Sequence, residues 1–304
     1  MTTPHDTLAW ARQITQHHAQ LQIGQPLNPA EAALPADAHL PQAQAAALQG
    51  ARMLGFIETD AQCVAQAWQH QTQRLGQFDP LHWPDQALDF QMPTWPRQNA
   101  FTPCPRALGL YAVLPTAQWV ARMAQAGVPT LQLRFKSDKP AEVATEVRAA
   151  VKAVAGTGAL LFINDHWQHA IDAGAHGVHL GQEDLDSADL TAIRKAGLRL
   201  GLSTHGYAEM MRADALSPSY IAMGAVFPTT LKNMPTAPQG LGRLGAYAKL
   251  MEGHSLVAIG GIDETRFADV RRTGVGSIAV VRALVTAADP EVMARNLMRR
   301  LAGI

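Results

Sequence analysis

Two aspartates that each follow a short apolar run are the first candidates for chemistry in this sequence. Asp165 ends the run "ALLFIND", and Asp184 follows "GVHLG" in the stretch "GVHLGQEDLD". Paired carboxylates suit Mg²⁺, which takes few carboxylate ligands and completes its shell with water and substrate phosphate oxygens. Each aspartate alone also fits a turn or a helix cap. Their occurrence after two consecutive runs favours the metal site.

Cationic and amide side chains follow or end other apolar runs. Gln132, Arg134 and Lys136 alternate along one run, so a strand would point all three to the same side. A buried cation is costly unless it is paired, and an anionic ligand would supply the partner. Lys232 adds a third cation in a threonine-bearing loop, although a solvated loop lysine is the alternative. Together with the aspartates, this group is suited to a metal-bound diphosphate.

A second phosphate corner is predicted nearer the C-terminus. Gly260 and Gly261 end the run "LVAIGGI", and "SIAVV" is the next run along the chain. Glycines let the backbone approach a phosphate closely, and the loops after strands seven and eight form the common phosphate site of (β/α)8 barrels. A sharp strand-to-helix turn would explain the same glycines. Two such corners indicate two phosphorylated substrates, one a diphosphate and one a monophosphate.

Eight apolar or β-branched runs must position these side chains. They alternate with alanine-rich segments of helical periodicity, and they begin at Leu108, Thr130, Ala159, Gly177, Leu198, Tyr220, Leu256 and Ser277. Strands alternating with helices form parallel sheets, so this α/β pattern predicts a closed (β/α)8 TIM barrel. An open doubly wound sheet is the alternative. In a barrel, the residues that follow the strands gather at one rim, where active sites lie.

The start of the chain has a different character, and we divide the protein into an accessory region at 1–105 and a barrel at 106–304. Glutamine, alanine, proline and tryptophan are frequent before residue 105. Apolar spacing predicts helices over Thr7–Leu21 and Asp60–Leu75, with the proline-punctuated loop "GQPLNPAEAALPADAHLPQ" between them. The accessory region is therefore expected to be small and mainly helical, followed by an irregular linker.

Four tryptophans suggest that the accessory region makes a packing contact. They stand at Trp10, Trp68, Trp83 and Trp95. Our hypothesis is that the region packs on the barrel or forms an oligomer interface, so that the protein is a possible homo-oligomer. A poorly ordered extension anchored by the tryptophans is the alternative.

Composition excludes several classes of function. The 304 residues are 47% apolar, and 25 lysines and arginines balance 25 aspartates and glutamates, so no general attraction to nucleic acid or to an anionic membrane is expected. The two cysteines, Cys63 and Cys104, argue against a disulfide framework or a zinc module. The polar start lacks the plan of a signal peptide, and no apolar run reaches the ~20 residues of a membrane span. A cytoplasmic protein that binds small phosphorylated molecules is expected.

Eight short motifs carry a resemblance to a known family. In order, "QLRFK", "IND", "GVHLGQEDL", "GLSTH", "GAVFPTTLK", "APQGL", "AIGGI" and "AVV" closely resemble thiamine-phosphate synthase, from about Leu108 to the C-terminus. The resemblance implies a barrel enzyme that joins hydroxymethylpyrimidine diphosphate to a (carboxy)thiazole phosphate, giving thiamine phosphate and pyrophosphate. It implies a Mg²⁺-dependent, carbocation-like step, in which the pyrimidine diphosphate ionises before the thiazole nitrogen attacks.

The resemblance also assigns roles to individual residues. It implies that Asp165 and Asp184 bind Mg²⁺, and that Lys136, Lys232 and Ser203 are catalytic. The residues that would hold the pyrimidine diphosphate are Gln132, Arg134, Lys136, Asn164, Ser203 and Lys232. The residues that would hold the thiazole phosphate are Thr229, Thr230, Leu231, Gly260, Gly261, Val281 and Arg282.

Three positions depart from the family pattern. Phe135 stands where glutamate is usual, Leu231 where a hydroxyl is common, and Arg282 where serine is frequent. A thiazole tautomerase and a non-catalytic sensor are the two alternative functions. A thiazole tautomerase generally lacks the metal aspartates and the diphosphate cations. A non-catalytic sensor of phosphate ligands would treat Leu231 and Arg282 as marks of a decayed site.

Overall fold

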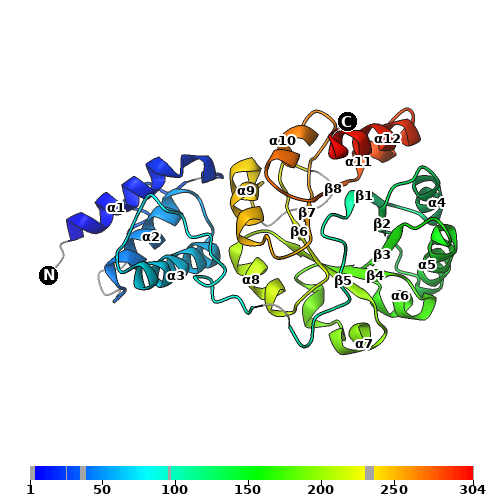
Figure 1. Ribbon diagram of the computed structural model, residues 1–304, viewed down its shortest axis with the longest axis horizontal. Helices are drawn as coiled ribbons and strands as arrows, with labels where there is room; N and C mark the ends of the chain where they lie inside the picture. Colours follow the sequence, from blue (N-terminus) through cyan, green and yellow to red (C-terminus); the bar gives the residue numbers. More distant parts are fainter. Residues whose placement is uncertain (1–3, 25, 35–38, 95–96, 230–235, 304) are drawn as a thin grey trace.

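A closed barrel of eight parallel strands forms the core of the computed structural model (Figure 1). The structure describes residues 4–24, 26–34, 39–94, 97–229 and 236–303. The strands are β1 (Gly109–Leu114), β2 (Thr130–Leu133), β3 (Leu160–Asn164), β4 (Gly177–Leu180), β5 (Arg199–Thr204), β6 (Tyr220–Met223), β7 (Leu256–Ala258) and β8 (Ser277–Val280). Pairing of β1 with β8 closes the barrel. The predicted α/β TIM barrel is confirmed, and each of the eight predicted runs contains one strand.

Helices surround the barrel, and local signals mark where several of them begin. Proline stands in the first turn of α5 and α12, where its fixed φ suits a helix start. Asp289 accepts a hydrogen bond from the backbone N–H of Val292 as the N-cap of α12. The outer elements are α4 (Ala117–Gln125), α5 (Pro140–Val154), α6 (Trp167–Ala173), η2 (Asp184–Asp186), α7 (Leu190–Lys195), α8 (Tyr207–Ala215), α9 (Gly240–Leu250), α10 (Phe267–Arg272), α11 (Arg282–Val285) and α12 (Pro290–Ala302). In the described part of the chain, no helix combines the length and the apolar character that crossing a bilayer requires.

Aromatic rings fill part of the barrel interior. Tyr111, Phe162 and Tyr220 have ring centroids 5.1–6.0 Å apart, and the hydroxyls of the two tyrosines lie 2.6 Å apart. Gly201 on β5 makes room for this cluster, because a Cβ at that position would lie 2.0 Å from the Tyr220 ring. Interiors are packed too densely to absorb such an overlap without displacing a neighbour.

The residues before the barrel form a small helical unit, here called the helical region (residues 1–105). Its helices are α1 (Pro4–His17), η1 (Ala19–Leu21), α2 (Gln42–Met53) and α3 (Glu58–Leu75). The helices predicted over Thr7–Leu21 and Asp60–Leu75 correspond to α1 with η1 and to α3. Helix α2 was missed. Most residues of α2 are buried, and its sequence "QAQAAALQGARM" is rich in small alanines. It therefore lacks the apolar stripe on one face that identifies a surface helix in a sequence.

The helical region lies against α8 and α9, on the side of the barrel between β5 and β7 (Figure 1). Trp83 donates a hydrogen bond from Nε1 to the hydroxyl of Tyr207 at 2.9 Å. Arg97 makes a buried ion pair with Asp214 at 2.7 Å. Of the four tryptophans singled out in the sequence, Trp95 lies outside the described residues. Buried apolar side chains of the helical region and the barrel belong to one continuous cluster.

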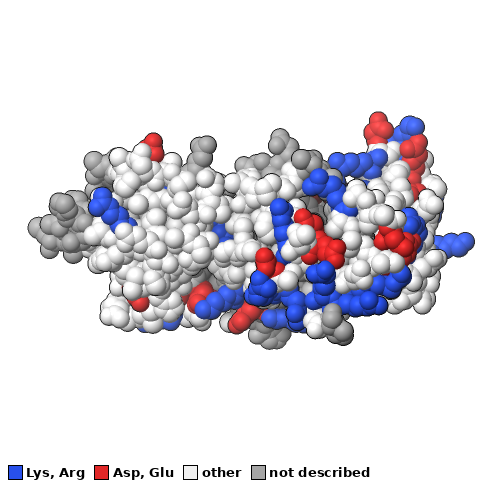
Figure 2. All heavy atoms as spheres, turned by 90° about the horizontal axis from the view of Figure 1, so that it is seen from above, with Lys and Arg blue, Asp and Glu red and all other residues white. Residues whose placement is uncertain are grey.

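Charged side chains are distributed unevenly over the molecule. The helical region contains four arginines and no lysine in its sequence. On the face shown in Figure 2, Lys, Arg, Asp and Glu are dense over the barrel half and sparse over the helical region. The cations that could attract phosphorylated molecules therefore belong mainly to the barrel.

The space at Gly201 leads to a stability prediction. Gly201→Ala should lower the free energy of unfolding by about 1–3 kcal/mol, because the added methyl overlaps the buried Tyr220 ring. Gly245→Ala is the matched control. No heavy atom lies within 4 Å of a Cβ at that position in α9, so alanine there should stabilise the helix by about 0.5–1 kcal/mol. Urea unfolding followed by circular dichroism measures both, and a Gly201→Ala variant as stable as the parent would contradict the packing account.

Candidate active site

A cavity of about 800 Å³ opens at the carboxyl ends of the strands, and residues from all eight strands or the loops that follow them line it. This volume suits a small-molecule ligand. Eleven of the residues singled out in the sequence line this one cavity: Gln132, Arg134, Asn164, Asp165, Asp184, Ser203, Thr229, Gly260, Gly261, Val281 and Arg282. Because the carboxyl ends of the strands meet at one rim, side chains that are far apart in the sequence lie together in this cavity.

Among the described residues that were singled out in the sequence, Lys136 does not line the cavity. The hydrogen bond from the Arg134 N–H to the Leu114 carbonyl continues the sheet one residue beyond β2. The strand alternation therefore holds for Gln132 and Arg134, but it does not extend to Lys136, which is exposed on the loop that follows. Thr230, Leu231 and Lys232 lie outside the described residues.

The two aspartates interact electrostatically. Enclosure by the surrounding protein raises the pKa of Asp165, the charge of Asp184 raises it further, and the Arg134 guanidinium opposes the rise. Among the described residues, no group of three or more histidines, cysteines, aspartates or glutamates could hold a metal ion.

The alternative structural roles of the aspartates are also visible. The N-cap position of α6 is His166, without a side-chain cap, so Asp165 does not serve as that cap. Asp184 does stabilise a turn, because its Oδ2 accepts a hydrogen bond from the Gly181 N–H at 2.8 Å. That bond fixes the carboxylate at the edge of the cavity, so the turn and a ligand-binding role are compatible.

Ser203 ends a chain of hydrogen bonds that runs into the barrel. Its Oγ lies 2.8 Å from His179 Nε2, and His179 Nδ1 lies 2.7 Å from the Tyr220 hydroxyl. The donor in each bond depends on the imidazole tautomer. His179 was not predicted as a site residue, although strand alternation from Gly177 places it on the inner face of β4. The chain holds the Ser203 hydroxyl in a defined position at the cavity wall.

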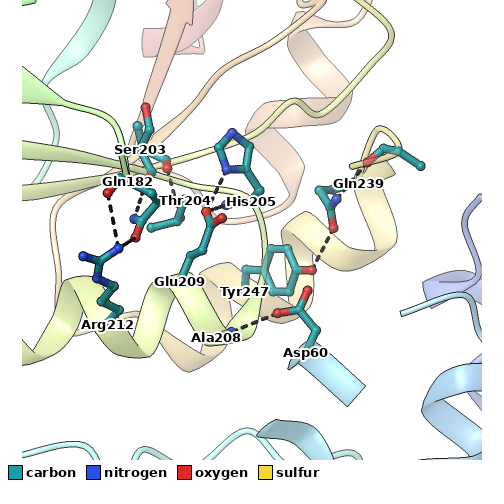
Figure 3. Close-up of polar contacts among 12 residues, drawn as sticks. Asp60, Gln182, Ser203, Thr204, His205, Ala208, Glu209, Arg212, Gln239 and Tyr247 are labelled. Carbon is teal, nitrogen blue, oxygen red and sulfur yellow. Dashed lines mark hydrogen bonds and ion pairs between the residues drawn. The ribbon is translucent and has the colours of Figure 1, made fainter. Parts of the chain in front are cut away.

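Amide side chains tie neighbouring strands together at the same rim. Gln132 Nε2 donates to Asn164 Oδ1 at 3.1 Å, linking β2 to β3. Gln182 Nε2 donates to the Ser203 carbonyl at 2.7 Å, and Arg212 donates to the Gln182 carbonyl (Figure 3). These contacts link β2 to β3, and they link the loop after β4 to β5 and to α8.

Backbone conformation and lack of space both require glycine at positions 260 and 261, here called the glycine corner. Gly260 and Gly261 have φ values of 104° and 63°, in the region that favours glycine. A Cβ at Gly260 would lie 2.5 Å from Ala225 Cα, and one at Gly261 would lie 2.6 Å from the Pro228 carbonyl oxygen. Both glycines therefore hold a bend that a residue with a side chain would strain, and this bend brings the backbone to the cavity surface.

Two arginines stand beside the glycine corner. Arg282 begins α11 and lines the cavity, as does Arg266. Arg266 donates from Nη1 to the Gly261 carbonyl at 2.8 Å, and its guanidinium lies 4.5 Å from the Phe227 ring centroid. Arg266 was not predicted, because it stands five residues past the glycine pair, beyond the strand end that guided the sequence analysis. This side of the cavity therefore combines cations with exposed backbone.

Comparison with known proteins gives a consistent result. A profile described as thiamine monophosphate synthase matches residues 110–284. A thiamine-phosphate synthase of Neisseria meningitidis serogroup A is 56% identical over 195 residues, which are 64% of this chain and 95% of the relative. One of Cronobacter sakazakii is 52% identical over 204 residues, 67% and 97% of the two chains. The solved thiamine phosphate pyrophosphorylase of Pyrococcus furiosus has a TM-score of 0.56 at 28% identity, over 64% of this chain and 98% of that one.

The coupled aspartates lead to a prediction about pKa. Asp184→Asn should lower the pKa of Asp165, because asparagine keeps an oxygen for the Gly181 N–H but removes the charge that raises it. Carboxyl ¹³C shifts followed through a pH titration without divalent metal would measure the change. Asp186→Asn is the control, because Asp186 is exposed and paired with Arg212.

The same pair predicts how stability depends on pH. The folded-state pKa of Asp165 lies above its unfolded value, so its contribution to stability is present at low pH and is lost as the pH rises through the folded-state pKa. Asp184→Asn should reduce that loss. An Asp165 titration that is identical in the parent and in Asp184→Asn would show that the two carboxylates are not coupled.

Proposed function

This chain belongs to the thiamine monophosphate synthase family, and we propose that it condenses hydroxymethylpyrimidine diphosphate with a thiazole phosphate, releasing pyrophosphate. It is accordingly an enzyme of the transferase class. The observation that carries the substrate assignment is one cavity with two unlike sides. The side of Asp165 and Asp184 suits a metal-bound diphosphate, and the side of Gly260 and Gly261 suits a monophosphate.

The diphosphate side offers donors and cations to the pyrimidine substrate. Arg134 lines the cavity, and a guanidinium makes strong charge-assisted hydrogen bonds to phosphate oxygens. Gln132 and Asn164 orient each other's amides and are proposed to hold the pyrimidine diphosphate. Ser203, fixed by His179, is proposed to contact the pyrimidine end of the substrate.

The aspartate pair fits Mg²⁺. Both groups are hard oxygen donors, and because burial and then the charge of Asp184 raise the pKa of Asp165, a bound cation would favour the ionised pair. We propose that Asp165 and Asp184 hold the ion together with water and the substrate diphosphate. When bound, Mg²⁺ would neutralise charge on the diphosphate as its bond to the pyrimidine carbon breaks.

The proposed reaction has two steps. The C–O bond breaks first, and its electron pair leaves with the diphosphate, so that a stabilised pyrimidine cation remains. The thiazole nitrogen then attacks that cation and forms the new C–N bond. Arg134, Lys136 and Lys232 are proposed to stabilise the charge that develops on the departing diphosphate, because preorganised cations act most strongly where charge forms. No serine or cysteine nucleophile is required.

The monophosphate side is proposed to hold the thiazole phosphate. Gly260, Gly261 and Val281 would offer backbone groups close to the ligand. Arg282 lines the same side, and its cationic group suits a phosphate in a place where the family frequently has serine. Thr229 lines the cavity too, and Thr230 and Leu231 remain predicted members of this set.

Pyrophosphate release from the purified full-length protein tests the proposed function. Release is expected only with hydroxymethylpyrimidine diphosphate, thiazole phosphate and Mg²⁺ together, and excess chelator should stop it. Asp184→Ala should abolish the metal-dependent turnover and leave the barrel folded, because Asp184 lies on a short 3-10 turn whose residues are not buried in the core. Asp186→Ala is the matched control on the same 3-10 turn and should retain activity.

Other outcomes separate the alternatives. Conversion of the thiazole phosphate alone, without pyrophosphate, would identify a tautomerase. Binding of either ligand with no release by a folded protein would identify a sensor. Full activity of Asp184→Ala would contradict the metal assignment.

Lys136 is tested separately because it lies outside the cavity lining. Lys136→Ala should lower kcat by about a hundredfold or more if the lysine reaches the departing diphosphate in the substrate complex. Lys139→Ala is the control from the same loop, because Lys139 is exposed and paired with Glu142. Equal turnover by the two variants would remove Lys136 from the proposed catalytic set.

A further inference from the structure

We propose that the helical region positions the loop between β5 and α8, which is one wall of the cavity, and that Asp60 of α3 is the positioning residue. The proposal rests on the proposed function only for its activity readout. Ser203 and Thr204 at the end of β5 and His205 of this loop line the cavity, and α8 begins at Tyr207. Nothing in the family match accounts for the contact, because the match begins at residue 110.

Helix α8 begins without an N-cap side chain of its own. Its N-cap residue is Gly206, which makes no side-chain cap, and the first N–H groups of a helix need acceptors from outside the helix. Asp60 Oδ1 accepts a hydrogen bond from the Ala208 N–H at 2.9 Å (Figure 3). A residue 148 positions away thus takes the role that serine or aspartate usually has at the N-cap.

The fit between Asp60 and the loop is close. Asp60 is 3% exposed. A Cβ at Gly206 would lie 1.9 Å from Asp60 Oδ2, so the carboxylate rests directly against the backbone of that glycine. Gly206 immediately follows His205, a cavity-lining residue. A shift of Asp60 would therefore be transmitted to the cavity wall through a single intervening residue.

The loop has a second connection to the helical region and a set of bonds within the barrel. Trp83 donates to the Tyr207 hydroxyl at 2.9 Å, so two residues of the helical region hold the first two residues of α8. Within the barrel, Glu209 Oε2 accepts from the His205 N–H at 2.8 Å and lies 2.7 Å from His205 Nδ1 (Figure 3). The barrel bonds orient His205, and the helical region fixes where the loop joins the helix.

Arg243 connects the helical region to a second cavity loop. It extends from α9 and is only 2% exposed. Its guanidinium donates to the carbonyls of Leu21 and Leu54 at 2.8 and 3.1 Å and lies 3.5 Å from the Phe56 ring centroid. The helical region therefore supplies the polar and aromatic partners that this buried cation needs.

Gln239 carries that connection to the loop between β6 and α9. Its Oε1 accepts from the Tyr247 hydroxyl at 2.9 Å (Figure 3) and from Arg243 at 3.4 Å. Its backbone N–H donates to the carbonyl of Ala225, a cavity-lining residue, at 2.8 Å. The helical region thus supports two adjacent walls of the cavity, and Asp60 makes the more direct of the two connections.

A positioning role differs from general stabilisation of the interface. The ion pair between Lys249 and Asp85, at 2.5 Å, also joins the helical region to the barrel. Lys249 stands in the last turn of α9, away from both cavity loops. Loss of this pair should weaken the interface and leave the cavity walls in place. Asp85→Asn is therefore the matched control.

The test compares Asp60→Ala, Asp60→Asn and Asp85→Asn in the full-length protein, by steady-state pyrophosphate release at a temperature where all three are folded. Asp60→Ala should lower kcat/KM by about tenfold to a hundredfold, because small displacements of substrate-positioning groups have effects of this size. Asp60→Asn should restore turnover, since its amide oxygen can accept from the Ala208 N–H. Asp85→Asn should match the parent.

Three outcomes would overturn the proposal. They are parental turnover by Asp60→Ala, an equal loss in Asp60→Ala and Asp85→Asn, and a loss in Asp60→Ala that asparagine does not rescue. If Asp60→Ala fails to fold, Trp83→Phe replaces it, because phenylalanine keeps a ring and loses the donor to the Tyr207 hydroxyl. Reduced turnover by that variant supports the proposal, and parental turnover overturns it.

Hydrogen exchange separates this proposal from the proposed function. If the parent releases no pyrophosphate, the proposed function fails, and the positioning role is then decided without substrate. Faster amide exchange in the peptide spanning 203–209 of Asp60→Ala than of Asp85→Asn would support it. Identical exchange in the two variants would overturn it.

Discussion

The pairing of β8 with β1 is the contact on which the site depends. Because Tyr111 stands opposite Ala279 in that register, the barrel closes and the carboxyl ends of all eight strands meet at one rim. Asp165 and Arg282 are separated by more than a third of the chain, yet both line one cavity. An open sheet would have spread the same side chains along a line. Closure converts a series of strand ends into a surface that can surround two ligands.

Sequence reasoning found the barrel and much of its rim because both depend on local patterns. A run such as "ALLFIND" shows its strand, and its end gives the positions of Asn164 and Asp165. The same logic found Arg134 and Gly261. Lys136 shows the limit of this logic, because alternation holds only while the chain remains paired to its neighbour. Once β2 ends, the direction of the next side chains is set by the loop.

Contacts between distant elements had no such signal. Helix α2 is buried by α1 and α3, so it lacks the stripe that marks an exposed helix. Nothing near Asp60 in the sequence indicates that it caps a helix 148 residues further on. The sequence around Gly206 does not show why glycine stands there either. A side chain at this position would overlap the carboxylate of Asp60, which only the folded structure brings close. Such features depend on how finished elements pack, which periodicity does not encode.

The hydrogen bonds of the buried Arg243 guanidinium also constrain the order in which parts of the molecule can fold during synthesis. Its acceptor at Leu21 is 222 residues earlier in the chain, so it leaves the ribosome long before α9 is synthesised. The first helices must therefore wait, with part of their surface uncovered, until most of the barrel exists. Contacts of such long range slow folding, because the intervening chain must close on itself before they form.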